Sequence, residues 1–153
     1  MRRFGFNLQR LLDYRRMTED TLLAELASIR AEYGRERARM LDMIRDRDAF
    51  SRRMKEDLRA QDAEQMRRSS DYLEDLSSQI STQEFTLRRI NERKEQKTAE
   101  VIEASKERKA LDRLRELKES EHKQEAQRAD QAFLDELATM RSHRQRCEIG
   151  DHA

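Results

Sequence analysis

Residues 22–54, LLAELASIRAEYGRERARMLDMIRDRDAFSRRM, carry the pattern that decides the fold. Steps of four and three residues alternate along one set of positions: Leu22, Leu26, Ile29, Tyr33, Glu36, Met40, Met43, Arg47, Phe50 and Met54. This spacing is typical of the a and d positions of a left-handed coiled coil. Gly34 costs about 1 kcal/mol relative to Ala, too little to end so long a helix. The stretch therefore predicts a long helix with a narrow apolar seam.

A second series with the same spacing follows further along the chain. Its members are Leu73, Leu76, Ile80, Gln83, Leu87, Ile90, Lys94, Lys97, Val101, Ala104, Arg108 and Leu111. Some of these positions hold lysine or arginine, and a polar residue at such a site lowers stability while it fixes register. The chain is therefore predicted to contain two long amphipathic helices of marginal stability.

Capping signals have to locate the turn between these helices, because Pro is absent and no Gly stands between residues 35 and 149. Asp62 and Gln65 have the spacing of a capping box, with Asp62 in the capping role. Asp71 and Glu74 offer a second box further along. The register of the apolar residues decides between the two.

Facing residues of an antiparallel hairpin have position numbers that sum to about twice the centre of the turn. Apolar layers match along the first helix when the turn is centred near residue 60, as in Ile29 with Ile90. A turn at 69–71 would instead set Tyr33 against Glu107. We therefore predict an all-α fold, a two-helix antiparallel coiled-coil hairpin forming a single domain. Its parts are helix one at about 7–59, a turn at about 59–62, helix two at about 62–146 and a disordered tail at about 147–153.

The second helix is longer than the first helix can cover. In this register Phe4 is the last apolar residue of the first helix, and it faces Leu117. Beyond that point one helical face of this C-terminal overhang carries Phe133, Leu134, Leu137 and Met140. A single amphipathic helix of about thirty residues is not held together by packing of its own, so we expect another protein to cover this face. The alternative is a frayed end whose apolar residues are incidental.

Composition excludes several classes of protein. Charged residues make up 42% of the 153 residues and apolar residues only 35%, too few for an ordinary globular core. The net charge of +1 provides no overall field for nucleic acid or an anionic membrane. Acidic residues are interspersed with the arginine runs, such as Arg35, Arg37 and Arg39, and no aromatic residues are interleaved with them, which favours a solvated helix flank. Since no window approaches a membrane span, we expect a cytoplasmic protein without membrane insertion.

Chemistry-bearing constellations are also missing from the sequence. The three histidines lack the spacing that brings two metal ligands onto one helical turn, and Cys147 is the only cysteine, expected to be an exposed tail thiol. The sequence contains no Gly-rich phosphate loop and no nucleophile–base arrangement in a pocket-forming context. We predict no enzyme activity, no cofactor and no metal.

Several of these stretches also carry a family resemblance. The opening FGFNLQRLLDYRRMTEDTLLAEL (4–26) resembles the start of FliJ-type flagellar export proteins, and YLEDLSSQI (72–80) resembles the family's block just beyond the hairpin tip. The C-terminal part is similar to a run found in FliJ and in YscO-like stalks of injectisomes. The matching residues are Lys109, Leu111, Leu114, Arg128, Asp130, Gln131, Asp135 and Glu136. Phe133 departs from the pattern, because many relatives carry a polar or smaller residue there.

This resemblance implies the central stalk of a flagellar type III export ATPase complex, at the cytoplasmic face of the basal body. Such a stalk inserts into a hexameric, FliI-like ATPase ring, promotes its assembly and activity, and links it to the FlhA-like export gate protein. Export chaperones are further implied partners. The implied ring-binding residues are Leu8, Leu11, Leu12, Arg128, Gln131, Phe133, Leu134, Leu137 and Met140. The implied gate-binding residues are Tyr72 and Leu76.

Two other functions stay open at this point. A structural scaffold would dimerise in trans through the same heptads, and a concentration-independent monomer would exclude it. A helical nucleic-acid-binding arm would show a steep salt dependence of binding, which the near-zero net charge makes the weaker hypothesis.

Overall fold

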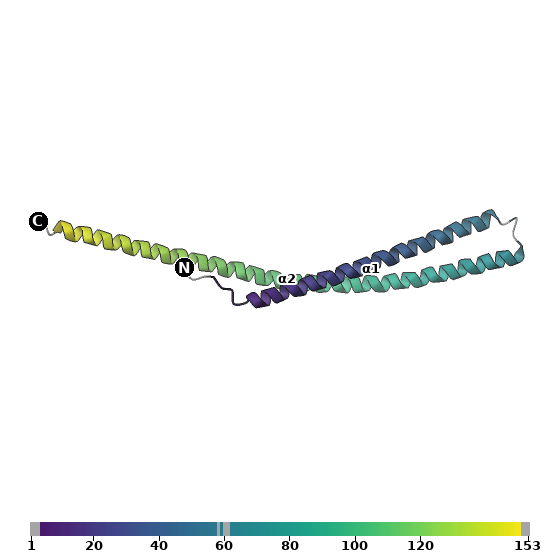
Figure 1. Ribbon diagram of the computed structural model, residues 1–153, viewed down its shortest axis with the longest axis horizontal. Helices are drawn as coiled ribbons and strands as arrows, with labels where there is room; N and C mark the ends of the chain where they lie inside the picture. Colours follow the sequence, from purple (N-terminus) through teal and green to yellow (C-terminus); the bar gives the residue numbers. More distant parts are fainter. Residues whose placement is uncertain (1–3, 58, 60–61, 151–153) are drawn as a thin grey trace. The chain divides into compact units, whose positions relative to one another are not determined.

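The computed structural model describes residues 4–57, 59 and 62–150, with side chains up to Ser142. Two helices account for nearly all of them, α1 (Gln9–Glu56) and α2 (Ala63–Gly150), and no strand occurs in the described part of the chain. Figure 1 shows the two helices side by side, joined at one end. The predicted all-α helical hairpin is confirmed.

Both helices have bounds close to those predicted. The N–H of Gln9 donates to the Phe6 carbonyl at 3.0 Å, which closes a turn just before α1. At the other end α2 runs to Gly150, past the position near 147 where a tail was expected, because no earlier residue interrupts the helix. Residues 60 and 61 of the predicted turn and 151–153 of the predicted tail lie outside the described residues.

A reciprocal capping box begins α2, as predicted. The N–H of Gln65 donates to Asp62 Oδ1 at 2.8 Å, and the N–H of Asp62 donates to Gln65 Oε1 at 3.3 Å. These bonds satisfy N–H groups at the start of the helix that have no acceptor within it.

Removing this cap should weaken the hairpin. For Asp62→Ala we expect the free energy of unfolding to fall by about 1 kcal/mol, because N–H groups at the start of α2 lose their acceptor. Asp71→Ala is the matched control, since Asp71 lies on the exposed surface inside α2. Urea denaturation followed by circular dichroism measures both. An equal loss in the two variants would contradict the assignment of the cap.

The chain divides into two compact units, each described by itself. In the unit Met17–Ser105 the core is a single seam between α1 and α2. Its buried apolar residues are Leu26, Ile29, Leu76, Ile80, Leu87, Ile90 and Ala104. Every one belongs to the two predicted series, so the predicted seam is confirmed.

Polar residues in this seam have partners, and these partners establish the register. Buried Gln83 donates through Nε2 to the carbonyl oxygen of Glu36 at 3.1 Å and to its Oε2 at 2.6 Å. Lys97 Nζ lies 2.9 Å from Glu25 Oε2. The midpoint of each pair lies between residues 59 and 62, which confirms a turn near residue 60 and excludes one at 69–71. Burying these groups would be costly without such partners.

Candidate functional site

The unit Met1–Arg16 with Lys106–Ala153 contains the predicted ring-binding residues. Leu8 and Leu11 are 38% and 41% exposed, whereas Leu12 is completely buried. Leu12 therefore holds the start of α1 in place and offers no surface to a partner. The sequence did not separate these roles, because adjacent positions 11 and 12 are both leucine.

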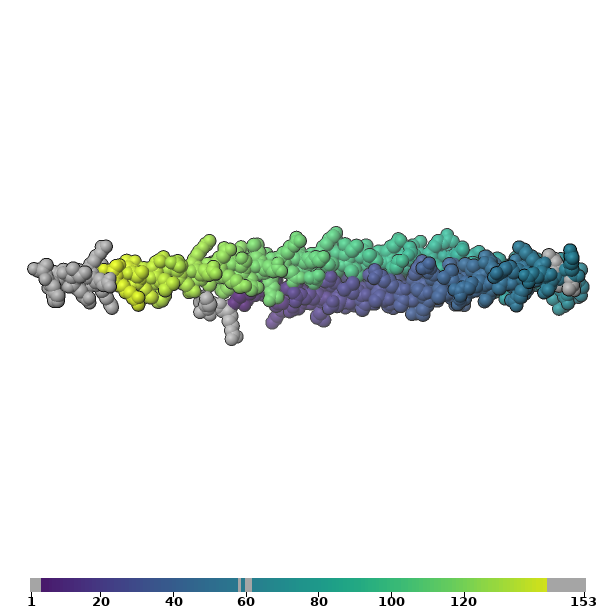
Figure 2. Space-filling model, turned by 90° about the horizontal axis from the view of Figure 1, so that it is seen from above, coloured from purple at the N-terminus to yellow at the C-terminus, as the bar shows by residue number. Residues whose placement is uncertain are grey.

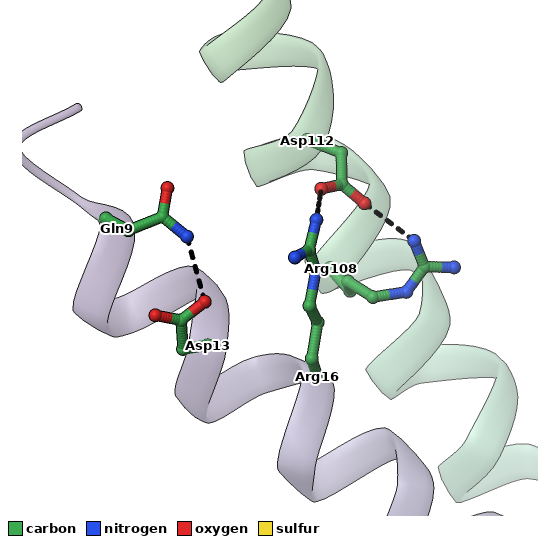
Figure 3. A network of polar contacts seen from close by, with 5 residues as sticks. All are labelled: Gln9, Asp13, Arg16, Arg108 and Asp112. Carbon is green, nitrogen blue, oxygen red and sulfur yellow. Dashed lines mark hydrogen bonds and ion pairs between the residues drawn. The ribbon is translucent and has the colours of Figure 1, made fainter. Parts of the chain in front are cut away.

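Charged side chains fasten the start of α1 to α2 (Figure 3). Asp112 accepts from Arg16 Nη2 at 2.8 Å and from Arg108 Nη1 at 2.6 Å. Arg15 Nη1 lies 2.6 Å from Glu107 Oε2. Partial burial raises the pKa of Asp112, but the hydrogen bonds from the two guanidinium groups outweigh it, so this pKa lies below its usual value. Asp112 thus links α2 to the start of α1, a role that the sequence prediction missed. We call this carboxylate, with Arg16 and Arg108, the anchor.

This anchor predicts a specific pH dependence. The pKa of Asp112 is lower in the folded than in the unfolded chain, so its stabilisation is complete above the usual carboxyl pKa and is lost as pH falls through the folded value. Asp112→Asn should lower the free energy of unfolding at pH 7 by about 1 kcal/mol and flatten its dependence between pH 5 and pH 2. Thermal melts across this range test it. Asp130→Asn, an exposed change on the same helix, should leave the profile unchanged.

The segment before α1 lies along α2 further than predicted. The Phe4 ring lies 5.8 Å from that of His122, centroid to centroid, while Leu117, its expected partner, is 56% exposed. A groove of about 680 Å³ separates residues 4–8 from a stretch of α2 that reaches Glu125. The pairing of Phe4 with Leu117 was wrong because it applied the register of the paired helices to Phe4, which precedes α1. Non-helical chain spans about 3.3 Å per residue, against 1.5 Å in a helix, and so reaches further.

Past this groove α2 has no neighbour among the described residues. All side chains from Gln127 to Ser142 are exposed, and Figures 1 and 2 show no other described element beside this part of α2. We call residues 127–142 the overhang. Its large apolar side chains, with their exposed fractions, are Phe133 (61%), Leu134 (58%), Leu137 (40%) and Met140 (54%). The predicted overhang is therefore present, and its apolar face is exposed among the described residues.

The overhang combines this face with polar flanks. Phe133, Leu137 and Met140 follow each other at steps of four and three residues, which places them on one side of the helix. Arg128 and Gln131 are also exposed, but at about 100° per residue Arg128 lies on the side of the helix opposite Leu137. Gln131 Nε2 donates to Asp135 Oδ1 at 3.1 Å. Contiguous apolar residues rimmed by polar ones are typical of protein-binding surfaces.

The two predicted gate-binding residues differ in exposure. Tyr72 is 49% exposed, and its ring lies 4.8 Å from that of Phe50, centroid to centroid. Leu76 is only 8% exposed and belongs to the seam. Of the two, only Tyr72 presents a surface that a partner can contact directly.

Two kinds of site were sought in the described part of the chain. Within it, no group of three or more His, Cys, Asp or Glu residues is arranged to hold a metal ion. No helix there has a stretch long and apolar enough to cross a membrane. The side chains of His143 and Cys147 lie outside the described residues.

Comparison with known proteins identifies the family. The family described as Flagellar FliJ protein matches residues 4–147, which covers α1, the overhang and all but the last three residues of α2. No curated protein and no solved structure matches the chain. Because the family match spans nearly the whole sequence, the chain belongs to the flagellar FliJ protein family.

Proposed function

We propose that the chain is the central stalk of the flagellar type III protein export ATPase complex and that its overhang enters the pore of a hexameric, FliI-like ATPase ring. Family membership gives the chain a role related to flagellar export, as a structural protein rather than an enzyme. The observation that carries the finer proposal is the overhang itself. Four large apolar side chains, 40% to 61% exposed, lie on a helix that nothing else in the described chain covers.

The ring would contact Phe133, Leu134, Leu137 and Met140 on one side of the helix, Arg128 and Gln131 on its other side, and Leu8 and Leu11 at the base. Leu12, being buried, would act by holding the start of α1. Burying the exposed half of one such apolar side chain contributes about 1 kcal/mol, so the four together contribute roughly 4 kcal/mol. This barely matches the lower estimates of the cost of association, about 4 kcal/mol. The overhang alone would bind weakly, as suits a stalk that must change its contacts.

Asymmetry supplies a mechanism. A single off-axis helix in a six-fold ring contacts each subunit differently, so the nucleotide state of each subunit can be coupled to stalk orientation through differential binding. The charged flanks of the overhang contribute little affinity because they are exposed and screened by salt. These flanks would make weak contacts that change as the stalk moves, rather than a fixed interface.

At the hairpin tip we propose contact with an FlhA-like export gate protein through Tyr72, with Leu76 supporting it from the seam. The complex would stand at the cytoplasmic face of the basal body. Export chaperones are proposed as further partners, without an assigned surface.

Reconstitution with the flagellar export ATPase of the same bacterium tests the proposal. Adding the full chain should raise the rate of ATP hydrolysis and the fraction of ATPase present as hexamer, because a pore-bound helix stabilises the ring. Gel filtration and a phosphate-release assay measure the two quantities. If neither quantity changes in the presence of folded chain, the proposal is wrong.

The alternative function as a trans-dimerising scaffold makes the opposite prediction for oligomeric state. Pairing within one chain already buries the heptad positions that a partner copy would have to share. We expect sedimentation equilibrium to give the monomer mass, 18.4 kDa, at all concentrations tested. A mass that doubles with rising concentration would favour the scaffold.

A further inference from the structure

Two rows of side chains border one side of the hairpin in the unit Met17–Ser105. Each row has members at i, i+3 and i+7, which share one side of a helix. The α1 row is Glu32, Arg35 and Arg39, and the α2 row is Thr86, Arg89 and Arg93. Arg93 Nη1 lies 3.3 Å from Glu32 Oε2, so the two rows face each other. A groove of about 220 Å³ lies there, lined by Glu32, Thr86, Arg89, Ile90 and Arg93.

We call the two rows together with the groove between them the arginine groove, and its positive charge is not balanced by the described residues around it. The one carboxylate of the two rows, on Glu32, is taken up by Arg93. Arg35, Arg39 and Arg89 are exposed, and none of them forms an ion pair with another described residue. Three guanidinium groups are therefore available to a partner.

An aromatic residue lies next to one arginine of the α2 row. Phe85 precedes Arg89 by one helical turn, so the two side chains are neighbours on α2. Phe85 lies outside the seam, and it is 58% exposed. The surface around Arg89 thus combines a cationic group with an exposed apolar ring.

The guanidinium groups of the groove favour a ligand that carries carboxylates on a short segment. A guanidinium group pairs with a carboxylate through two parallel hydrogen bonds. The rows are seven residues long, roughly 10 Å of helix, which matches one or two turns of a partner segment. Nucleic acid would need a longer basic track and several stacking aromatics, and the carboxylate of Glu32 lines the groove.

We propose that the arginine groove binds a short acidic segment of a partner protein, with its carboxylates on Arg35, Arg39 and Arg89 and an apolar side chain against Phe85. The site lies in a different unit from the overhang and does not depend on ring binding.

Fluorescence anisotropy with the full chain tests the proposal. The probe is a labelled fifteen-residue helical peptide, designed with Glu residues at i,i+4 spacing and two leucines. Arg35→Gln/Arg39→Gln/Arg89→Gln should weaken its binding about tenfold or more, because three charge-assisted pairs are lost. Phe85→Ala should weaken it about threefold through the lost apolar contact.

The matched control is Arg30→Gln/Arg37→Gln/Arg88→Gln. This control removes the same number of charges at the same level of the hairpin. On α1, however, Arg30 and Arg37 lie 140° to 180° around the helix from Arg35 and Arg39, at about 100° per residue. The proposal expects this control to lose less than about threefold, as screening of exposed charges allows. Equal losses in the two triple variants would overturn it, as would tighter competition by duplex DNA than by unlabelled peptide. Circular dichroism should show unchanged helix content in all variants.

Discussion

The Phe133→Ala/Leu137→Ala variant is expected to lose most of the stimulation that the chain gives to the export ATPase. Both side chains are exposed in the overhang, so the change removes partner contacts without removing contacts within the chain. Losing about 1 kcal/mol at each position corresponds to roughly a 30-fold rise in the concentration that gives half-maximal stimulation. Titrating the variant into the hydrolysis assay measures this shift.

A matched control separates a site-specific effect from a general loss of apolar surface. Leu41→Ala/Ile102→Ala also removes two exposed apolar side chains, 40% and 51% exposed, but from the unit Met17–Ser105. It should stimulate the ATPase like the wild type. Both double variants should unfold within about 0.5 kcal/mol of the wild type, as surface substitutions do. Equal stimulation by the two double variants would contradict the assigned ring contact.

The largest effect on stability is expected for Ile90→Ala. Its side chain is 4% exposed in the seam, and truncation leaves a cavity between the two helices. We expect the free energy of unfolding to fall by about 2 to 4 kcal/mol, a large part of the total for a small protein. Urea denaturation measures it from the shift of the midpoint at constant slope.

Ile102→Ala provides the comparison for this prediction, because it makes the same chemical change on the same helix at a side chain that is 51% exposed. It should cost less than about 0.5 kcal/mol. If the two variants were destabilised equally, Ile90 would not lie in a core.

Periodicity predicted the seam because every layer of a coiled coil obeys the same local rule. Ile29 and Ile90 are both buried as their spacing requires, and Asp62 with Gln65 forms the cap that the sequence suggests. These features depend on residues three, four or seven apart in the sequence, or on the constant sum of the position numbers of facing residues. They are therefore readable without a structure.

Two kinds of feature were not predictable in the same way. One depends on the direction in which a side chain leaves the helix, and the other on a segment that is not helical. Phe4 reaches His122 because its segment is not helical. The sequence presents Arg35, Arg37 and Arg39 as one run, but on a helix Arg37 turns away from the other two. Arg89, which completes the groove, comes from the other helix. Reading each flank of both helices in the predicted register would have brought these arginines together.

Cross-linking from the overhang tests the central claim most directly. A photoreactive benzoylphenylalanine introduced at position 137 of the full chain should form a covalent product with the export ATPase, mapped by mass spectrometry to residues that line its pore. The same group at position 41, in the other unit, should form little or none. Cross-links to the ATPase from position 41 and none from position 137 would contradict the account.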